Sequence, residues 1–363
     1  ADFEQKASPI GGKTGTGPRR GGPRGACCAQ PKDAGNQGWA GNPPAAKHRL
    51  GGTGRFWQAW HSGRRTWLGT RRRPAARAAR PQDWQRLKGT RVMGFVLGLV
   101  ATVAAVYLLI LGYLWATQRR HVFRPDHDRP DLAQSAVAGQ MREVTVSGAD
   151  GLALGAWYAP AQPGLPTLLY CHGNAGTLGG RDERVLPYLR RGYGVLLVAY
   201  RGYGGNPGAP TEAGLYADAR AHLDWLLAQG VAADRVVLYG ESLGAAVAVQ
   251  LATERRVGAL VLEAPFASIV LSARARYPLF AFDWLIADKF ASIDKIDRVQ
   301  APLFIIHGTR DRVTPMRFGR LLFDKAKEPK TGIWPEGAGH NDLLSFGMVE
   351  AVTGFLQRLG LAR

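Results

Sequence analysis

One serine lies in a setting that could make it a nucleophile. Ser242 is the centre of the pentapeptide Gly240-Glu241-Ser242-Leu243-Gly244, which separates a β-branched apolar run ending at Tyr239 from an Ala-rich stretch. This succession of strand, sharp turn and helix is the context that a G-x-S-x-G elbow requires. The two glycines have a steric reason to be there, because side chains at their positions would collide with the adjoining strand and helix. We therefore expect Ser242 to be the nucleophile.

A serine hydroxyl reacts when a base takes its proton and an acid orients that base. Around a nucleophile elbow these partners follow in the order Ser, acid, His. His340 lies in a Gly-rich loop, residues 337–342, that can bring an imidazole over the sheet, so it is the predicted base. Asp311, in a turn directly after an expected strand, is the predicted acid. Glu263, at the end of another strand, is the rival, although a structural contact to the elbow suits it better.

Backbone N–H groups near the nucleophile can stabilise the negative charge that acyl transfer builds on the carbonyl oxygen. The N–H of Leu243 is one donor by the geometry of the elbow. The second donor is expected in the loop after the third strand and is assigned to the backbone N–H of Asn174, because Gly173 and Gly176 permit a close approach. The three cysteines have no metal-ligand spacing, and no metal or organic cofactor is implied.

From about residue 140 the chain alternates between strand and helix patterns, which predicts a mostly parallel sheet with helices on both faces. The first two strands are joined by a hairpin-like turn and are expected to be antiparallel. The eight expected strands cover residues 143–147, 152–157, 166–171, 195–200, 236–239, 259–263, 303–307 and 332–335. An aromatic-rich insertion, residues 264–300, is expected to form one or two short helices as an apolar wall beside the nucleophile, in place of a full lid.

An uncharged apolar segment, residues 92–116, precedes the predicted catalytic domain of residues 140–363. Its 25 residues suffice to cross a hydrocarbon core of about 30 Å. Tyr113, Trp115 and the following Arg119 are typical of an interfacial anchor. We predict one transmembrane helix, followed by a juxtamembrane linker over 117–139. A cleaved signal peptide is the alternative, which the poor cleavage site after residue 116 disfavours.

The first 91 residues differ in composition from the rest of the chain. They hold 19 Lys or Arg and 4 Asp or Glu, whereas residues 92–363 hold 28 and 24, so the basic character belongs to this tail. Without apolar periodicity it is predicted to be disordered. Five tryptophans among its arginines could stack on nucleic acid or bind anionic lipid. A solvated arm is the simpler interpretation, and nucleic acid is not an expected partner.

The first methionine is Met93, so a competing interpretation holds that residues 1–92 precede the native start. The two interpretations predict different orientations. With the basic tail, the positive-inside rule keeps the N-terminus in the cytoplasm and exports the catalytic body. With a start at Met93, the arginines after the helix keep the body in the cytoplasm.

Six ordered motifs carry a resemblance to a known family. They are the apolar anchor followed by Phe123-Arg124-Pro125, then H-G-N-A-G at 172–176, Y-R-G-Y-G at 200–204, G-E-S-L-G at 240–244, G-T-R-D at 308–311 and G-x-G-H-N-D at 337–342. On these motifs, residues of roughly 120–363 resemble a membrane-anchored α/β-hydrolase of the ABHD type. The resemblance implies a serine hydrolase of acyl esters or thioesters. Asn206, where many relatives have Ser, departs from the pattern, and the basic tail has no counterpart.

The leading hypothesis is a single-pass membrane protein that hydrolyses carboxylic esters or thioesters through an acyl-Ser242 intermediate, with Asp311 and His340 as its partners. The expected substrate is a small acyl ester or a lipid-like molecule. A serine exopeptidase acting on small peptides is the alternative among enzymes. A membrane-tethered binding protein with an idle hydrolase body is the alternative from another class, because fold alone cannot choose between them. No oligomeric state is predicted.

Overall fold

A computed structural model describes residues 80–279 and 282–362. The chain divides into two units, residues 1–77 and 78–363, and all of the described residues belong to the second unit. The predicted disorder of the basic tail therefore lies outside the described residues as far as residue 79.

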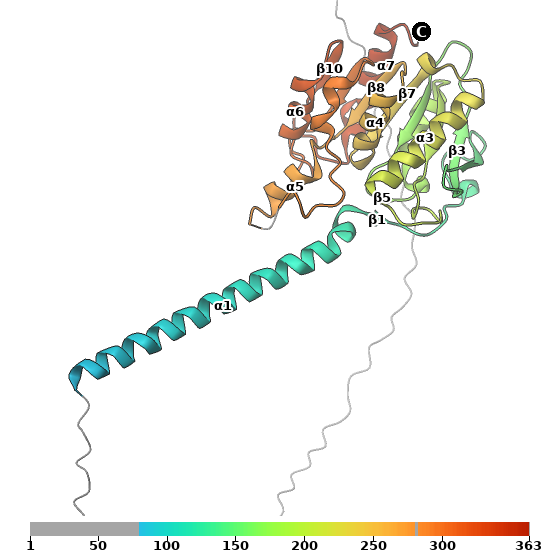
Figure 1. Ribbon diagram of the computed structural model, residues 1–363. Coiled ribbons are helices and arrows are strands. Elements are labelled where there is room, and N and C mark those ends of the chain that lie inside the picture. Colours follow the sequence, from blue (N-terminus) through green and yellow to red (C-terminus); the bar gives the residue numbers. More distant parts are fainter. Residues whose placement is uncertain (1–79, 280–281, 363) are drawn as a thin grey trace, which may run out of the picture. The chain divides into compact units, whose positions relative to one another are not determined.

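An eight-stranded sheet lies at the centre of the second unit, with the strand order β10-β9-β8-β7-β4-β6-β3-β2 (Figure 1). Strand β2 pairs antiparallel with β3, and β3 pairs antiparallel with β6, whereas the other neighbours are parallel. The strands are β2 (Arg142–Ser147), β3 (Ala153–Ala159), β4 (Thr167–Cys171), β6 (Gly194–Val198), β7 (Val236–Glu241), β8 (Ala259–Glu263), β9 (Leu303–Ile306) and β10 (Lys330–Ile333). The predicted mostly parallel eight-stranded sheet and its antiparallel opening are confirmed.

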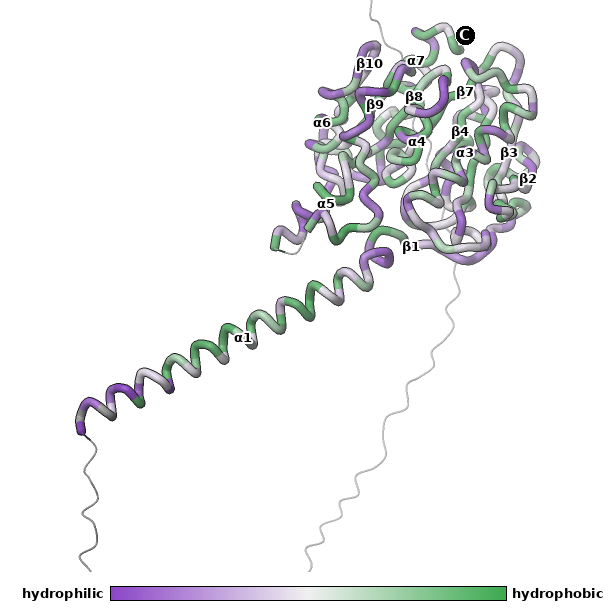
Figure 2. The backbone as a smooth tube through the Cα atoms, in the orientation of Figure 1, coloured by the Kyte–Doolittle hydropathy of each residue, from purple (hydrophilic) through white to green (hydrophobic). Residues whose placement is uncertain are grey.

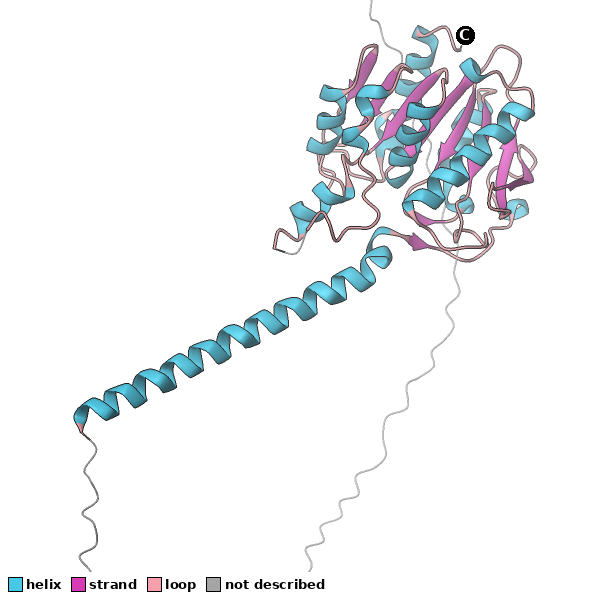
Figure 3. Cartoon of the chain, in the orientation of Figure 1, coloured by secondary structure: helices cyan, strands magenta, loops and turns pink. Residues whose placement is uncertain are grey.

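Helices cover both faces of this sheet, as predicted (Figure 3). One core cluster joins the sheet to α3 (Glu212–Ala228), α4 (Leu243–Glu254) and α6 (Arg317–Lys325). A second cluster joins the other face to α2 (Asp182–Arg190) and α7 (Met348–Arg358). All residues of β4, β6, β7 and β8 are buried. These strands therefore read as continuous apolar runs and not as alternating ones.

Helix α1 (Pro81–Val122) is longer than the predicted transmembrane helix of residues 92–116. Residues 81–91 are helical, which corrects the assignment of this part to the disordered tail. Proline suits the first turn of a helix, and Gln, Leu, Lys and Arg are strong helix formers, so local propensity extends the helix without an apolar stripe. Figure 2 shows the middle of α1 as apolar and its ends as polar.

The predicted linker over residues 117–139 is ordered. Helix α1 continues to Val122, and β1 (Arg124–Pro125) then pairs in parallel with β5 (Ala175–Gly176). A 3₁₀ turn, η1 (Leu132–Gln134), follows. The residue before a proline is biased towards extended backbone, which explains why the helix ends before Arg124.

The insertion after β8 contains α5 (Ile269–Arg276) and two 3₁₀ turns, η4 (Ser292–Asp294) and η5 (Ile296–Arg298). These are the short helical elements expected there. The remaining 3₁₀ turns are η2 (Leu178–Arg181), η3 (Ala233–Arg235) and η6 (Leu343–Phe346).

Candidate active site

The turn between β7 and α4 holds Ser242 in a strained conformation, with φ 50° and ψ −107°. Its N–H donates to the carbonyl of Glu263 over 2.9 Å, which ties the turn to β8. A Cβ atom at Gly240 would lie 2.5 Å from the Cα of Ala245. One at Gly244 would lie 2.0 Å from a backbone oxygen on the neighbouring β4. Only glycine fits these two positions, as the sequence predicted.

The structure brings the three predicted site residues, Ser242, His340 and Asp311, together. His340 Nε2 lies 3.1 Å from Ser242 Oγ, and His340 Nδ1 lies 2.7 Å from Asp311 Oδ2. The Asp311 side chain is fully buried, and that of His340 is 11% exposed. A carboxylate oxygen can only accept, so Nδ1 of a neutral His340 carries the proton and Nε2 is free to accept one from the serine.

The turn after β9 stabilises Asp311 in its ionised form. Its Oδ1 accepts hydrogen bonds from the N–H groups of Val313 (2.8 Å) and Thr314 (2.7 Å). Burial opposes the charge, but the hydrogen bonds from His307 and His340 hold the pKa of Asp311 well below its usual range. Asp311 is therefore an ionised acceptor facing the imidazole.

His307 is a member of this network that the sequence analysis missed. Its Nε2 lies 3.1 Å from Asp311 Oδ2 and 2.7 Å from the carbonyl oxygen of Thr314, so this nitrogen must carry a proton. The ring is fully buried, and a Cβ atom at Gly319 would lie 2.4 Å from its Nδ1. The available signal was the four-residue spacing between His307 and Asp311 across a tight turn.

Glu263, the rival acid, has different partners. Its carboxylate pairs with the Arg184 guanidinium and accepts from the Tyr239 hydroxyl over 2.9 Å. Burial raises the pKa of Glu263 despite the nearby arginine. Together with the backbone contact to Ser242, this fits the structural role expected for Glu263.

The loop after β4 carries Asn174, the second predicted oxyanion donor. The Asn174 side chain accepts a hydrogen bond from the N–H of Arg124 over 2.9 Å, so the end of α1 is tied to this loop. His172 donates through Nδ1 to the Gly173 carbonyl over 2.7 Å, and burial lowers the pKa of His172 to about 4, which keeps it neutral. Within the described residues, the N–H groups of Asn174 and Leu243 donate to no protein acceptor. Both are available to a ligand.

A cavity of about 300 Å³ lies over Ser242 and is lined by Ser242, Leu243 and Asn174. The rest of its lining is mainly apolar and comes from α1, α5 and the insertion, including Leu111, Leu114, Trp115, Phe266, Tyr277 and Leu285. The expected wall of the insertion is confirmed for the last three of these residues. The contribution of α1 was not predicted.

Other aromatic residues of the insertion serve different purposes. Phe290 is buried in the core against Phe123, whereas Phe282 and Trp284 are exposed, and Phe280 lies outside the described residues. Within residues 80–279 and 282–362, no three His, Cys, Asp or Glu side chains are grouped to hold a metal ion.

Asn206, the departure from the family pattern, has a structural role. Its Oδ1 accepts from the Gly155 N–H over 2.8 Å, and its Nδ2 donates to the carbonyl of Ala199 over 3.1 Å. The side chain thereby fastens its loop to β3. It is not among the residues that line the cavity over Ser242.

Comparisons with known proteins agree with this architecture. A family model for the alpha/beta hydrolase fold matches residues 166–292. An uncharacterized protein of Mycobacterium tuberculosis is 41% identical over 266 residues, which cover 72% of this chain and 94% of that protein. Alpha/beta hydrolase domain-containing protein 17B of Homo sapiens is 36% identical over 201 residues, which cover 53% of this chain and 64% of that protein.

Among solved structures, an esterase of Pyrococcus furiosus matches with a TM-score of 0.54 and 19% identity, over 66% of this chain and 97% of that one. An alpha-beta hydrolase of Vibrio vulnificus matches with a TM-score of 0.52 and 22% identity, over 61% and 84%. At these identities the likeness is one of fold. Together with the sequence relatives, it shows that the chain belongs to the α/β-hydrolase family, as a hydrolase of the ABHD type.

Proposed function

We propose that the protein is a membrane-anchored serine hydrolase that cleaves acyl ester or thioester bonds through an acyl-Ser242 intermediate. The observation that carries this proposal is the continuous line of hydrogen bonds from Ser242 Oγ through His340 to Asp311, at 3.1 and 2.7 Å. With Nδ1 of His340 donating to Asp311, Nε2 can accept the proton of Ser242 Oγ, which is the arrangement that nucleophilic attack needs. Ser242, at one end of this line of hydrogen bonds, lines a mainly apolar cavity.

In the first half of the reaction, Ser242 Oγ attacks the acyl carbonyl carbon while His340 Nε2 takes the hydroxyl proton. The carbonyl π electrons move onto oxygen, and the N–H groups of Leu243 and Asn174 donate to the resulting oxyanion. Asp311 stays ionised and stabilises the imidazolium. The carbonyl bond then reforms, the bond to the leaving oxygen or sulfur breaks, and His340 returns the proton to that atom.

In the second half, water attacks the acyl-Ser242 carbonyl carbon and gives its proton to His340 Nε2. The bond between Ser242 Oγ and the acyl carbon breaks, and His340 protonates the departing serine oxygen. The products are a carboxylic acid and an alcohol or thiol. Ser242 attacks the carbonyl carbon, and the oxyanion donors bind the carbonyl oxygen, whether the leaving atom is oxygen or sulfur, so the same residues serve esters and thioesters.

The lining of the cavity favours an acyl substrate over a peptide. A carboxylate is the side chain that best binds the ammonium group at a peptide's amino terminus. Among the described residues that line this cavity, none is Asp or Glu. Leucine, isoleucine and aromatic side chains dominate instead, and they suit hydrocarbon.

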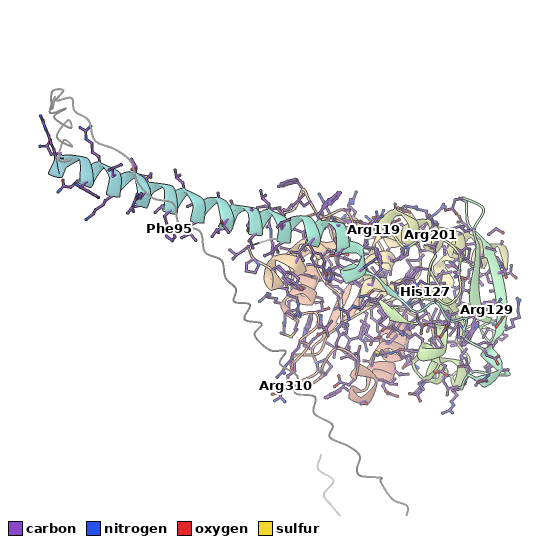
Figure 4. The ribbon with its side chains drawn as sticks, turned by 90° about the horizontal axis from the view of Figure 1, so that it is seen from below. Phe95, Arg119, His127, Arg129, Arg201 and Arg310 are labelled. Atoms are coloured by element: carbon purple, nitrogen blue, oxygen red, sulfur yellow. The ribbon has the colours of Figure 1, made fainter. Side chains whose placement is uncertain are left out.

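Membrane anchoring is supported by the composition and exposure of α1. The helix is long and apolar enough to cross a membrane, and none of its most apolar window is buried in the protein. Phe95 and Leu109 are each 73% exposed. In Figure 4, Phe95 projects from α1 far from Arg119, which lies in the last turn of the helix. Such side chains would be unfavourable in water, at about 25 cal/mol per Å² of apolar surface, and favourable in lipid.

The proposal is tested by labelling the full-length protein with a fluorophosphonate, which reacts covalently with activated serines. We expect one labelled serine, Ser242, in the peptide map, and no label in Ser242→Ala. Ser345→Ala, at an exposed serine near the His340 loop, is the matched control and should label like the parent. Equal labelling of the parent and Ser242→Ala would refute the assignment of the nucleophile.

A further inference from the structure

The cavity over Ser242 has part of its wall from α1. Leu111, Leu114, Trp115, Gln118 and Val122 all line it. Their spacing of three, four and seven residues places them on one face of the helix. Leu109 lies on the opposite face and is 73% exposed. One face of a helix that we propose to span the membrane is thus a surface of the active site.

Polar contacts hold this face of α1 against the insertion. The Tyr107 hydroxyl donates to the carbonyl of Leu279 over 2.8 Å. Gln118 donates to the Leu285 carbonyl over 3.2 Å and accepts from a backbone N–H of the insertion over 2.8 Å. Arg119 pairs with the buried carboxylate of Asp288 at 2.9 Å. These contacts bring the insertion alongside α1 from its C-terminal end back to Tyr107.

The part of the insertion beside Tyr107 exposes large apolar side chains. Leu279 is 72% exposed and Trp284 is 77% exposed, and Tyr277 at the edge of the cavity is 42% exposed. Tyr107 itself lies within the uncharged segment of residues 92–116. The exposed side chains therefore lie beside the section of α1 that is apolar enough to be in lipid. Large apolar side chains exposed on one short segment favour contact with lipid or with a partner over contact with water.

The length of the apolar segment indicates the depth of the cavity. About 20 apolar residues cross the hydrocarbon core, and residues 92–116 exceed this. Tyr113 and Trp115 are residues that favour the membrane interface. The charged pair of Arg119 and Asp288 follows at the end of the helix. The cavity wall formed by residues 111–115 is thus at the level of the bilayer surface.

We infer that the cavity takes its acyl chain directly from the bilayer, through a route between α1 and α5, and that α1 is the wall that limits chain length. This inference rests on the proposed function. The substrate class that fits is a molecule whose acyl chain is inserted in the membrane. Leu114 and Leu111 on α1 are then specificity-determining residues. The exposed side chains at 277, 279 and 284 contact lipid, so that the cavity opens towards the bilayer.

The first experiment compares two substitutions on opposite faces of α1 in the full-length protein in phosphatidylcholine vesicles. Leu114→Trp places a larger side chain in the cavity. Leu109→Trp makes the same change on the face of α1 that is turned away from the cavity. The readout is the ratio of kcat/KM for p-nitrophenyl decanoate to that for p-nitrophenyl acetate. We expect Leu114→Trp to lower this ratio about tenfold or more, since a pocket discriminates strongly by fit, and Leu109→Trp to leave it unchanged. An unchanged ratio in Leu114→Trp, or an equal fall in both variants, would overturn the role of α1.

The second experiment tests the route from the bilayer. Leu279→Asp places a charge on the apolar surface beside Tyr107, and Leu321→Asp, at a 45% exposed leucine of α6, is the matched control. With p-nitrophenyl palmitate dissolved in the vesicles, Leu279→Asp should lower the rate about tenfold, because a charge resists insertion into lipid, while the control keeps the parent rate. Equal rates for Leu279→Asp and the control would overturn the route.

The assignment of Ser242 as the nucleophile and the role of α1 can be refuted separately. If Ser242 is not the nucleophile, Ser242→Ala still hydrolyses p-nitrophenyl acetate and still labels. If only the inference about α1 is wrong, Ser242→Ala is inactive, yet Leu114→Trp and Leu279→Asp behave like their controls.

Discussion

Of the buried carboxylates near Ser242, the one in the turn after β9 and the one at the end of β8 have surroundings that are opposite in kind. Asp311 accepts from two histidines and two backbone N–H groups, and its pKa is held below the usual range. Glu263 accepts from Arg184 and Tyr239, and burial raises its pKa. Burial alone therefore does not make a carboxylate useful for catalysis.

The difference lies in what each carboxylate faces. Asp311 directs one oxygen at His340 and satisfies the other with backbone donors, so its charge is available to an imidazolium. The charge of Glu263 is already neutralised by a guanidinium, so it can add little to a base. Its position behind the elbow serves to hold β7, β8 and α2 together.

Asp311→Asn should have the largest effect. The amide can present its N–H₂ group to Nδ1, which favours the wrong tautomer of His340, so kcat for a p-nitrophenyl ester should fall by about 10⁴. Circular dichroism should show an unchanged fold. A kcat within tenfold of the parent would remove Asp311 from the site.

His307→Phe should have a smaller effect on the same carboxylate. The ring is retained but the hydrogen bond to Asp311 is lost, and we expect kcat to fall by about tenfold, as for one charge-assisted hydrogen bond of 1.5–3 kcal/mol. His307→Gln keeps a donor and should recover part of the rate. If the Phe and Gln variants are equally slow, His307 acts through packing alone.

Glu263→Gln should affect stability more than activity. Arg184 then loses its counter-charge, but the raised pKa of Glu263 means that the fold already disfavours the charged carboxylate, so the free energy of unfolding at pH 7 should change by only about 1 kcal/mol. The kcat of the folded fraction should remain within about threefold of the parent. A loss of kcat as large as that of Asp311→Asn would transfer the acid role to the end of β8.

The pH dependence of unfolding should separate the two carboxylates by sign. Asp311, with a lowered pKa, contributes stability that is present above its unfolded value of 3.8 and is lost as pH falls. Glu263, with a raised pKa, contributes most below its unfolded value of 4.5 and less as pH rises. Between about pH 6 and pH 3, Asp311→Asn should lose less unfolding free energy than the parent, and Glu263→Gln should lose more. Urea unfolding in detergent measures both, and slopes equal to that of the parent would contradict the comparison.

Two of the three predicted site residues, Ser242 and Asp311, lie in short motifs that follow buried apolar strands, so the sequence could bring them forward as candidates. Ser242 follows β7 and Asp311 lies just beyond β9, so the apolar run of each strand and the motif after it identify these positions from nearby residues alone. The Arg184–Glu263 pair, separated by 79 residues, and the tie from Arg124 to Asn174, separated by 50, leave no local signal.

Helix α1 shows a second limit of sequence analysis. An apolar run of Leu, Val and Ala looks alike on all faces, so the face that lines the cavity could not be identified before the fold was known. The polar residues at the start of α1 lack apolar spacing and were therefore assigned to the tail, although their helix propensity is high.

The most direct test of the account is the identification of the covalent intermediate. The full-length protein is mixed with p-nitrophenyl decanoate, and the reaction is quenched with acid during turnover. The protein is then digested, and the masses of the peptides are measured by mass spectrometry. We expect a decanoyl group on the peptide that contains Ser242 in the parent, and no such group in Ser242→Ala. Turnover without an acylated peptide, or a decanoyl group on a different residue of the cavity such as Ser272, would contradict it.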